Sequence, residues 1–130
     1  MHAGPDILLI EDSASQALQL QLLLQRAGYR VTLANDGLVG WRAACAQPPR
    51  LILLDVDLPA LDGFQVLARL KRDPATANIP VVMLTQRMHV SQVERAIALG
   101  ADDYLFKEDV VHQLCAVVAQ LLGLNTSSVD

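Results

Sequence analysis

The chain has 130 residues, 52% of them hydrophobic, which is enough for one domain with a hydrophobic core and too short for two ordinary domains. Its formal net charge is −4 and its Lys and Arg residues are scattered, so it lacks the signature of a nucleic-acid-binding protein, and no direct nucleic-acid contact is expected. It has no apolar run long enough to span a membrane and no signal-peptide pattern, which predicts a cytoplasmic protein without membrane contact.

The first third of the chain alternates strand-like and helix-like segments. Residues 6–10 contain an uninterrupted apolar run, typical of a strand buried on both faces of a parallel sheet. Ser13 and Gln16 have the spacing of a capping box, which predicts a helix that Gly28 ends. Its apolar side is expected to include Ala17, Leu18, Leu22 and Leu24 or residues near them. Residues 30–34 alternate polar and apolar side chains, as in a strand near a sheet edge.

The rest of the chain continues this alternation. Residues 51–54 and 81–84 are again apolar runs and predict central strands, whereas the mixed segment 103–106 suits a strand near an edge. The expected helices cover residues 37–46, 64–71, 88–99 and 109–122. Cys45 and Cys115 lie in these helices without metal-ligand spacing, so we expect reduced, buried thiols.

Strict alternation of strands and helices implies right-handed crossovers and a doubly wound α/β sandwich. A (βα)5 member of this class most often has a five-stranded parallel sheet of order 2-1-3-4-5, the flavodoxin-like arrangement, with ligands at the carboxyl ends of the strands. We expect an N-terminal extension over residues 1–5, one domain over 6–123, and a polar tail or linker stub over 124–130.

Acidic residues follow two strands that are neighbours in this sheet order. Glu11 and Asp12 come after the first strand and Asp55 after the third, so three carboxylates are expected at one sheet edge. Like charges this close repel, which leaves raised pKa values or a bound cation. Mg²⁺ suits such ligands, with Mn²⁺ as an alternative. Each acid alone would more often be a helix cap or a solvated charge, but the three together favour a site.

Two further polar residues end the remaining strands. Thr85 ends the fourth strand and Lys107 the fifth, which adds a hydroxyl and an ammonium group to the same edge. Phosphoryl transfer requires such groups and a metal around a carboxylate, because this chemistry is mostly positioning and charge neutralisation. The residues therefore predict Asp55 as a nucleophile that forms an acyl phosphate.

Four stretches carry a family resemblance: LLIEDS at 8–13, LILLDVDLPALDGF at 51–64, IPVVMLT at 79–85 and GADDYLFK at 100–107. With them, residues 6–123 resemble the receiver domains of two-component response regulators. The resemblance implies a phosphorylation-activated switch in which Asp55 accepts a phosphoryl group from the phosphohistidine of a sensor kinase, with Mg²⁺ as cofactor. It implies no enzymatic activity beyond self-catalysed phosphorylation and dephosphorylation.

The resemblance also assigns the metal site residue by residue. Glu11, Asp12 and Asp55 would support Mg²⁺, with Asp12 a direct ligand in preference to Glu11. The backbone carbonyl of Asp57 would be a further ligand. The loop that follows is expected to be shaped only by turn residues, namely Pro59, Asp62 and Gly63.

The same resemblance describes how a switch would work. Lys107 would pair with the phosphoryl oxygens, and Thr85 would hydrogen-bond them once they arrive. Tyr104 stands where the family has its aromatic switch residue, and movement of Thr85 would let Tyr104 turn inward. The output face would be formed by the fourth helix, the fifth strand and the fifth helix.

The implied partners are a sensor histidine kinase or phosphotransfer protein upstream and an output domain or partner protein downstream. A homodimer through the output face is a further option.

One row of the last helix is expected to face the core: Val110, Leu114, Val117 and Leu121. A second row is the candidate for a partner or dimer surface: Val111, Val118 and Leu122.

Two positions depart from the family pattern. Glu108 stands where most receivers have a cis-proline, and a non-proline cis bond costs about 2.5–4 kcal/mol, so the reach of Lys107 stays open. Gln86 and Arg87 follow Thr85, where the family usually has a small residue. Longer side chains beside the phosphate predict altered phosphorylation kinetics, of either sign.

A phosphatase is an alternative from another class. The sequence Asp55-Val56-Asp57 is also the D-x-D pattern of haloacid-dehalogenase-type phosphatases, with Asp102 and Asp103 as their later acidic pair. In that family, however, the motif follows the first strand, whereas here it follows the third. Asp102 and Asp103 also enter the last strand from its amino end, which predicts a position at the opposite edge from Asp55.

The same fold is also compatible with two different functions. A flavin-binding module would need a Gly/Ser/Thr-rich phosphate cradle after the first strand, where this chain has Glu11 and Asp12. A receiver-like interaction module that is locked in one state by Glu108 and Gln86 would work without phosphorylation.

Overall fold

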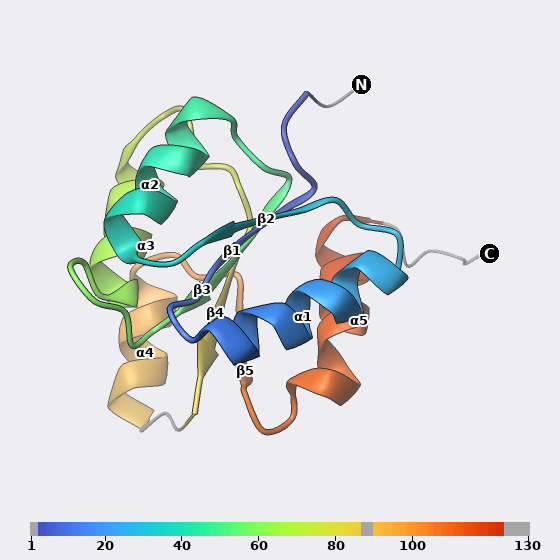
Figure 1. Cartoon of the computed structure of the whole chain (residues 1–130). Coiled ribbons are helices and arrows are strands. Elements are labelled where there is room, and N and C mark those ends of the chain that lie inside the picture. Colours follow the sequence, from blue (N-terminus) through green and yellow to red (C-terminus); the bar gives the residue numbers. More distant parts are fainter. Residues whose placement is uncertain (1–2, 87–89, 124–130) are drawn as a thin grey trace.

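A computed structural model describes residues 3–86 and 90–123 of the chain. Strands and helices alternate along it (Figure 1). The strands are β1 (Ile7–Ile10), β2 (Val31–Ala34), β3 (Leu51–Asp55), β4 (Val81–Thr85) and β5 (Asp103–Phe106). The helices are α1 (Ala14–Arg26), α2 (Gly37–Ala46), α3 (Gly63–Arg72), α4 (Val90–Ala98) and α5 (Val110–Leu121). The predicted elements are confirmed apart from small shifts at their ends, although Met88 and His89, expected in the fourth helix, lie outside the described residues.

The strands form one parallel sheet of order β2-β1-β3-β4-β5, which confirms the predicted fold class. All residues of β1, β3 and β4 are buried, because helices cover both faces of these strands. β2 and β5 form the edges and have mixed burial. Ile10 pairs with Leu54 across β1 and β3, so the residues that follow each of them meet at one edge of the sheet.

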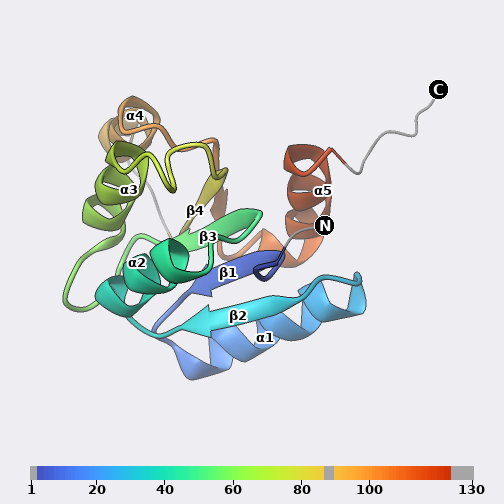
Figure 2. The ribbon, with the colours of Figure 1, turned by 90° about the horizontal axis from the view of Figure 1, so that it is seen from above.

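Helices lie in two layers, with α1 and α5 on one face of the sheet and α2, α3 and α4 on the other (Figures 1 and 2). Successive strand residues point to opposite faces, so each strand supplies both layers. Leu9 and Leu53 pack with Leu20 of α1 and Leu114 of α5. The opposite layer is larger and contains Leu8, Ile10, Ile52, Leu54, Val66, Leu67, Leu70 and Met83.

The helix caps differ from the sequence prediction in one respect. Ser13 caps α1 by accepting a hydrogen bond from the Gln16 backbone N–H at 3.4 Å, but the reciprocal arm of the predicted capping box is absent. The Gln16 side chain accepts from Lys107 instead, at 2.8 Å. The described part of the chain has its complete capping box at α3, where Asp62 and Gln65 bond each other's backbone N–H groups at 3.0 and 2.9 Å. Asp62 is therefore a helix cap as well as a turn residue.

The predicted apolar face of α1 is partly wrong. Leu18 and Leu22 are 53% and 44% exposed, whereas Leu20 is 3% exposed and belongs to the core. Five leucines occur within seven positions of this helix, so helical spacing alone selects no single face. Ala17 and Leu24 are buried as predicted.

The predicted faces of α5 also need correction. Val110 and Leu114 are buried as expected, but Val118 of the supposed outer row is fully buried too. Val117 and Leu121 are only half-buried, and Val111 is 48% exposed. The buried stripe therefore runs Val110, Leu114, Val118, a row that helical spacing alone does not distinguish from its neighbours. Both cysteines are free thiols and half-buried, which is less than predicted.

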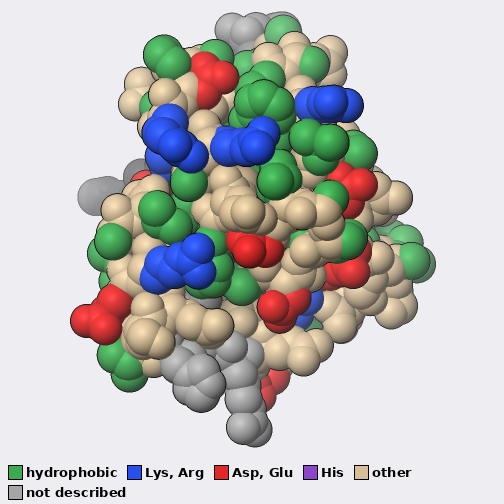
Figure 3. Space-filling view, turned by 90° about the vertical axis from the view of Figure 1, so that its left-hand side faces the viewer, with side chains coloured by type: hydrophobic (Ala, Val, Ile, Leu, Met, Phe, Trp, Pro, Cys, Tyr) green, Lys and Arg blue, Asp and Glu red, His purple; other side chains and the backbone are tan. Residues whose placement is uncertain are grey.

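Figure 3 shows the surface that α2, α3 and α4 form. On this face Lys and Arg side chains are interspersed with hydrophobic and acidic ones. Within residues 3–86 and 90–123, each helix is too short or too polar to cross a membrane.

Candidate functional site: an acidic pocket with a lysine

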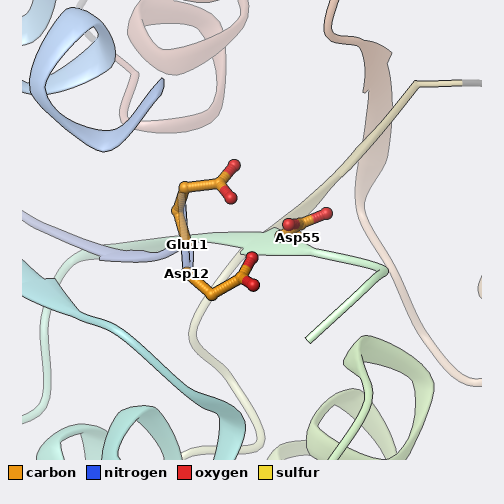
Figure 4. A group of neighbouring side chains, drawn as sticks. All are labelled: Glu11, Asp12 and Asp55. Atoms are coloured by element: carbon orange, nitrogen blue, oxygen red, sulfur yellow. The ribbon is translucent and has the colours of Figure 1, made fainter. Parts of the chain in front are cut away.

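Three carboxylates meet where the sequence predicts, at the carboxyl ends of β1 and β3. Glu11 and Asp55 are 3% and 1% exposed, whereas Asp12 is exposed. One oxygen of each residue lies within 4.8 Å of the others. Figure 4 shows the carboxyl groups of Glu11 and Asp12 on one side of a common space and Asp55 on the other. Burial of two acids beside a third is costly unless a positive charge compensates them.

Lys107 supplies a positive charge from the end of β5. Its Nζ lies 2.8 Å from Glu11 Oε1 and 3.1 Å from Asp55 Oδ2. The described part of the chain contains no cis peptide bond, so the Lys107–Glu108 peptide is trans and the lysine still reaches Asp55. The Lys107 backbone N–H donates to the Thr85 carbonyl at 2.7 Å, which ties its position to β4.

The protonation of this cluster follows from burial and charge. Burial and the neighbouring Glu11 carboxylate together raise the pKa of Asp55 to about 7, against the opposing effect of Lys107. Burial by itself lowers the pKa of Lys107, but its contacts with Glu11 and Asp55 outweigh this and raise it. The metal-free pocket therefore holds an ammonium group and one carboxyl that is poised between its two protonation states near neutral pH.

The donor set of this pocket fits a small divalent cation. Carboxylate oxygens from three residues lie close enough together for a single ion to contact all of them after small side-chain movements. Glu11 Oε1 is buried and has no hydrogen-bond partner among the described residues beyond its ion pair with Lys107. Asp12 lies at the exposed side, where water molecules would supply further ligands. Hard oxygen ligands of this kind favour Mg²⁺ or Mn²⁺.

The loop after β3 is held close against Asp55. The Asp57 backbone N–H donates to Asp55 Oδ1 at 3.1 Å, and the Gly63 N–H donates to the Val56 carbonyl at 2.8 Å. A Cβ atom on Gly63 would lie 2.7 Å from Val56 Cα and closer still to the Asp55 carbonyl oxygen. Gly63 is therefore more than the turn residue that the sequence predicts, since its missing side chain lets α3 approach the Asp55 backbone.

Of the remaining predicted residues, Thr85 and Tyr104 belong to β4 and β5. Thr85 is 1% exposed and ends β4, beside the strand that carries Asp55. Tyr104 is half-buried, with its ring 6.2 Å from that of Phe106 in an edge-to-face arrangement. Gln86 is exposed, and Arg87 lies outside the described residues. The backbone carbonyl predicted as a metal ligand belongs to Asp57, whose side chain is exposed.

Asp102 and Asp103 do not join the acidic pocket. Asp102 accepts a hydrogen bond from the Val81 N–H at 2.8 Å and pairs with Lys71 Nζ at 3.4 Å. Val81 is the first residue of β4, so this pair lies at the amino end of the sheet, opposite Asp55. The second acidic pair that a haloacid-dehalogenase-type phosphatase needs is therefore at the wrong edge.

Sequence reasoning misses one residue of the site. The capping-box spacing assigns Gln16 to the start of α1, yet its side chain bonds to Lys107. The available signal is its position in the first turn of the helix that directly follows Glu11 and Asp12. The competing capping-box pattern conceals this possibility.

The raised pKa of Asp55 predicts a pH dependence of stability in the metal-free protein. In the folded state Asp55 keeps its proton up to about pH 7, whereas in the unfolded state it loses the proton at its usual pKa of 3.8. The free energy of unfolding therefore falls as pH rises from about 4 to about 7 and then levels off. Between pH 5 and 8 the loss should be about 1–3 kcal/mol. Urea unfolding in EDTA would measure it. Asp55→Asn should remove this decline, and an unchanged slope in that variant would contradict the assignment.

Comparison with known proteins relates this geometry to a family. A sequence model described as "Response regulator receiver domain" matches residues 7–119. The chain is 42% identical over 118 residues to the DNA-binding dual master transcriptional regulator RpaA of Synechocystis, a match that covers 91% of this chain and 49% of that protein. It is 42% identical over 103 residues to the transcriptional regulatory protein AfsQ1 of Streptomyces coelicolor, covering 79% and 44%. The chain thus spans about half the length of these relatives.

Solved structures agree with this similarity. The receiver domain of a signal transduction histidine kinase from Syntrophus aciditrophicus superposes with a TM-score of 0.85 at 32% identity, covering 98% of each chain. The receiver domain of the sensor histidine kinase PA1611 from Pseudomonas aeruginosa gives a TM-score of 0.84 at 31% identity, covering 93% of this chain and 99% of that one. That structure is described with a magnesium ion coordinated in its active-site cleft.

Proposed function

The chain belongs to the response regulator receiver domains, and on this premise we propose that it switches state when Asp55 accepts a phosphoryl group in a two-component system. The observation that carries the proposal is the setting of Asp55. It is buried at the end of β3, beside Glu11 and Asp12, with the Lys107 ammonium 3.1 Å away. A nucleophilic carboxylate that lies beside other acidic groups and a lysine ammonium group suits phosphoryl transfer.

In the proposed reaction, a carboxylate oxygen of Asp55 forms a bond to phosphorus while the bond between phosphorus and the donor's imidazole nitrogen breaks. The donor histidine leaves with the bonding electron pair, and Asp55 becomes an acyl phosphate. In the separate dephosphorylation step, water attacks phosphorus, the Asp55 oxygen leaves with the bonding electron pair, and inorganic phosphate is released. Both steps are catalysed by the domain's own residues, so the protein is a switch and not an enzyme acting on other molecules.

We assign a divalent cation, Mg²⁺ or Mn²⁺, to the carboxylates of Glu11, Asp12 and Asp55 and the backbone carbonyl of Asp57. The cation would neutralise charge on the phosphoryl oxygens during transfer. Lys107 contributes a second positive charge that is already directed at Asp55 Oδ2. Asp12, which is exposed, is the ligand nearest to solvent.

The switch itself involves Thr85 and Tyr104. Thr85 is buried and its backbone carbonyl accepts the Lys107 N–H, so the two phosphoryl-binding side chains belong to linked backbone segments. Phosphorylation would draw the Thr85 hydroxyl towards Asp55, and the half-buried Tyr104 would turn into the space that it leaves. The surface of α4, β5 and α5 would change as a result.

We propose that phosphoryl groups come from a cytoplasmic sensor histidine kinase or phosphotransfer protein. The altered α4–β5–α5 surface would act on an output domain, a partner protein or a second copy of the chain. Residues 6–123 would form the receiver domain between a short extension and a polar tail. The first relative is named a DNA-binding regulator, but the net charge of −4 favours a protein partner for this chain.

The proposal is tested by incubating the protein with acetyl phosphate and Mg²⁺ and recording its intact mass. We expect the gain of one phosphoryl group, its loss on treatment with hydroxylamine, which cleaves acyl phosphates, and no gain when EDTA replaces Mg²⁺. Beryllofluoride, a phosphoryl mimic, should change the fluorescence of Trp41 or Tyr104. Absence of both the mass gain and the beryllofluoride response would favour the phosphorylation-independent interaction module.

A further inference from the structure

The active-site lysine has a partner from outside the acidic pocket. Lys107 Nζ donates a hydrogen bond of 2.8 Å to Gln16 Oε1, across 91 residues of sequence. Gln16 lies in the first turn of α1 and is half-buried. The contact joins the end of β5 to α1 at the rim of the site.

Lys107 has a fixed number of donors. An ammonium group has three N–H bonds, and three acceptors surround this one: Gln16 Oε1 and Glu11 Oε1 at 2.8 Å, and Asp55 Oδ2 at 3.1 Å. Two of these acceptors are carboxylates in the group of residues that fits a cation. The third is a neutral amide on a neighbouring helix, and it is not part of that group.

This difference matters when the pocket contains Mg²⁺. A cation bound to the carboxylates of Glu11 and Asp55 competes with Lys107 for their oxygen atoms. Its positive charge also repels the ammonium group. Both effects weaken the ion pairs that hold Lys107 in the metal-free state. The hydrogen bond to Gln16 competes with no metal ligand, so it remains available in the metal-loaded state.

The backbone around Lys107 gives the side chain little additional restraint. Glu108 follows it, and unlike proline it does not fix its own φ angle. Lysine also has a long, flexible side chain that loses much rotamer freedom when it is held in one place. Side-chain contacts must therefore fix the ammonium group, and Gln16 is the one that does not depend on the charge state of the pocket.

We propose that Gln16 is a positioning residue that holds Lys107 towards Asp55 while Mg²⁺ occupies the carboxylates. The inference rests on the proposed function, because the role of Lys107 is to meet the incoming phosphoryl oxygens. Gln16 itself contacts neither Asp55 nor the transferred group. It acts through its hydrogen bond to Lys107.

The chain offers a matched set of variants. Gln16→Met keeps the length of the side chain but removes its strong acceptor, and Gln16→Glu restores an acceptor at the same reach. Gln19→Met is the control. Gln19 is exposed, lies one turn further along α1, and lines the same surface pocket as Gln16 and Lys107. Its side chain makes no hydrogen bond among the described residues. Unfolding curves of all variants would exclude loss of the fold.

The first measurement does not depend on phosphorylation. Lysine ammonium groups give their own proton–nitrogen NMR signals, and hydrogen bonding slows their exchange with water. We expect Gln16→Met to speed exchange at Lys107 about three- to tenfold, the size expected for loss of one hydrogen bond, with the larger effect in Mg²⁺. Gln16→Glu should restore protection, and Gln19→Met should leave it unchanged.

The second measurement is the phosphorylation rate with acetyl phosphate at saturating Mg²⁺. Gln16→Met should lower it about three- to tenfold, while Gln19→Met matches the wild type. Unchanged exchange in Gln16→Met, or equal exchange in Gln19→Met, would overturn the inference. So would faster exchange with an unchanged phosphorylation rate. If the wild-type protein accepts no phosphoryl group, the proposed function fails, and the positioning role of Gln16 fails with it. The exchange data would still decide whether the contact between Gln16 and Lys107 exists.

Discussion

Asp55→Asn should abolish the Mg²⁺-dependent gain of a phosphoryl group from acetyl phosphate. An amide nitrogen replaces one carboxylate oxygen and the side chain loses its charge, so the residue is no longer a nucleophile for phosphorus. The amide also removes one of the acidic ligands from the cluster and should weaken Mg²⁺ binding. The fold should survive, because a neutral amide removes both the cost of burying a charge and the repulsion with Glu11, which together raise the pKa of Asp55 to about 7. Intact mass measures the loss of phosphorylation, and urea unfolding measures the stability of the variant.

Asp109→Asn is a matched control for this prediction. Asp109 is exposed, and its side chain makes no capping hydrogen bond at the start of α5. The same chemical change there should leave the mass gain intact. If the Asp55→Asn protein still gained a phosphoryl group in the presence of Mg²⁺, the acceptor would be another residue. That result would contradict the assignment of Asp55.

Gly63→Ala should destabilise the domain by about 3 kcal/mol or more, at the upper end of the range for overpacking, because the atoms that the methyl group meets cannot move aside. The added methyl group would lie 2.7 Å from Val56 Cα and closer still to the Asp55 carbonyl oxygen. Both neighbours are backbone atoms, so relief requires movement of the chain that carries the phosphoacceptor. We therefore expect a slower phosphorylation rate as well as a lower urea midpoint.

Gly28→Ala separates this steric effect from the conformational cost of replacing a glycine. Gly28 has a φ angle of +97°, and a Cβ atom there would meet nothing within 4 Å. Its substitution should cost only about 1–2 kcal/mol through backbone strain and leave phosphorylation unchanged. Gly63 has no positive φ angle, so its cost comes from space. A Gly63→Ala protein as stable and as active as Gly28→Ala would disprove the close approach.

The face of an amphipathic helix is harder to predict than its existence. In α1, leucines recur so densely that Leu18 and Leu22 fit a helical stripe as well as Leu20 and Leu24 do, yet only the second pair is buried. In α5 the same ambiguity separates the predicted rows from the observed one, with Val118 in the core and Val117 half-buried. The angle at which each helix crosses the sheet selects the buried row, and that angle depends on packing between layers.

The sequence by itself determined the order of strands and helices and the meeting of Glu11, Asp12 and Asp55. Uninterrupted apolar runs mark buried parallel strands, and residues at the carboxyl ends of neighbouring strands meet at one edge for topological reasons. Only the tertiary structure decided that Gln16 bonds to Lys107 and that Gly63 lies against Asp55. These contacts join segments far apart in the chain or depend on ångström-scale packing, and local sequence patterns contain no record of such distances.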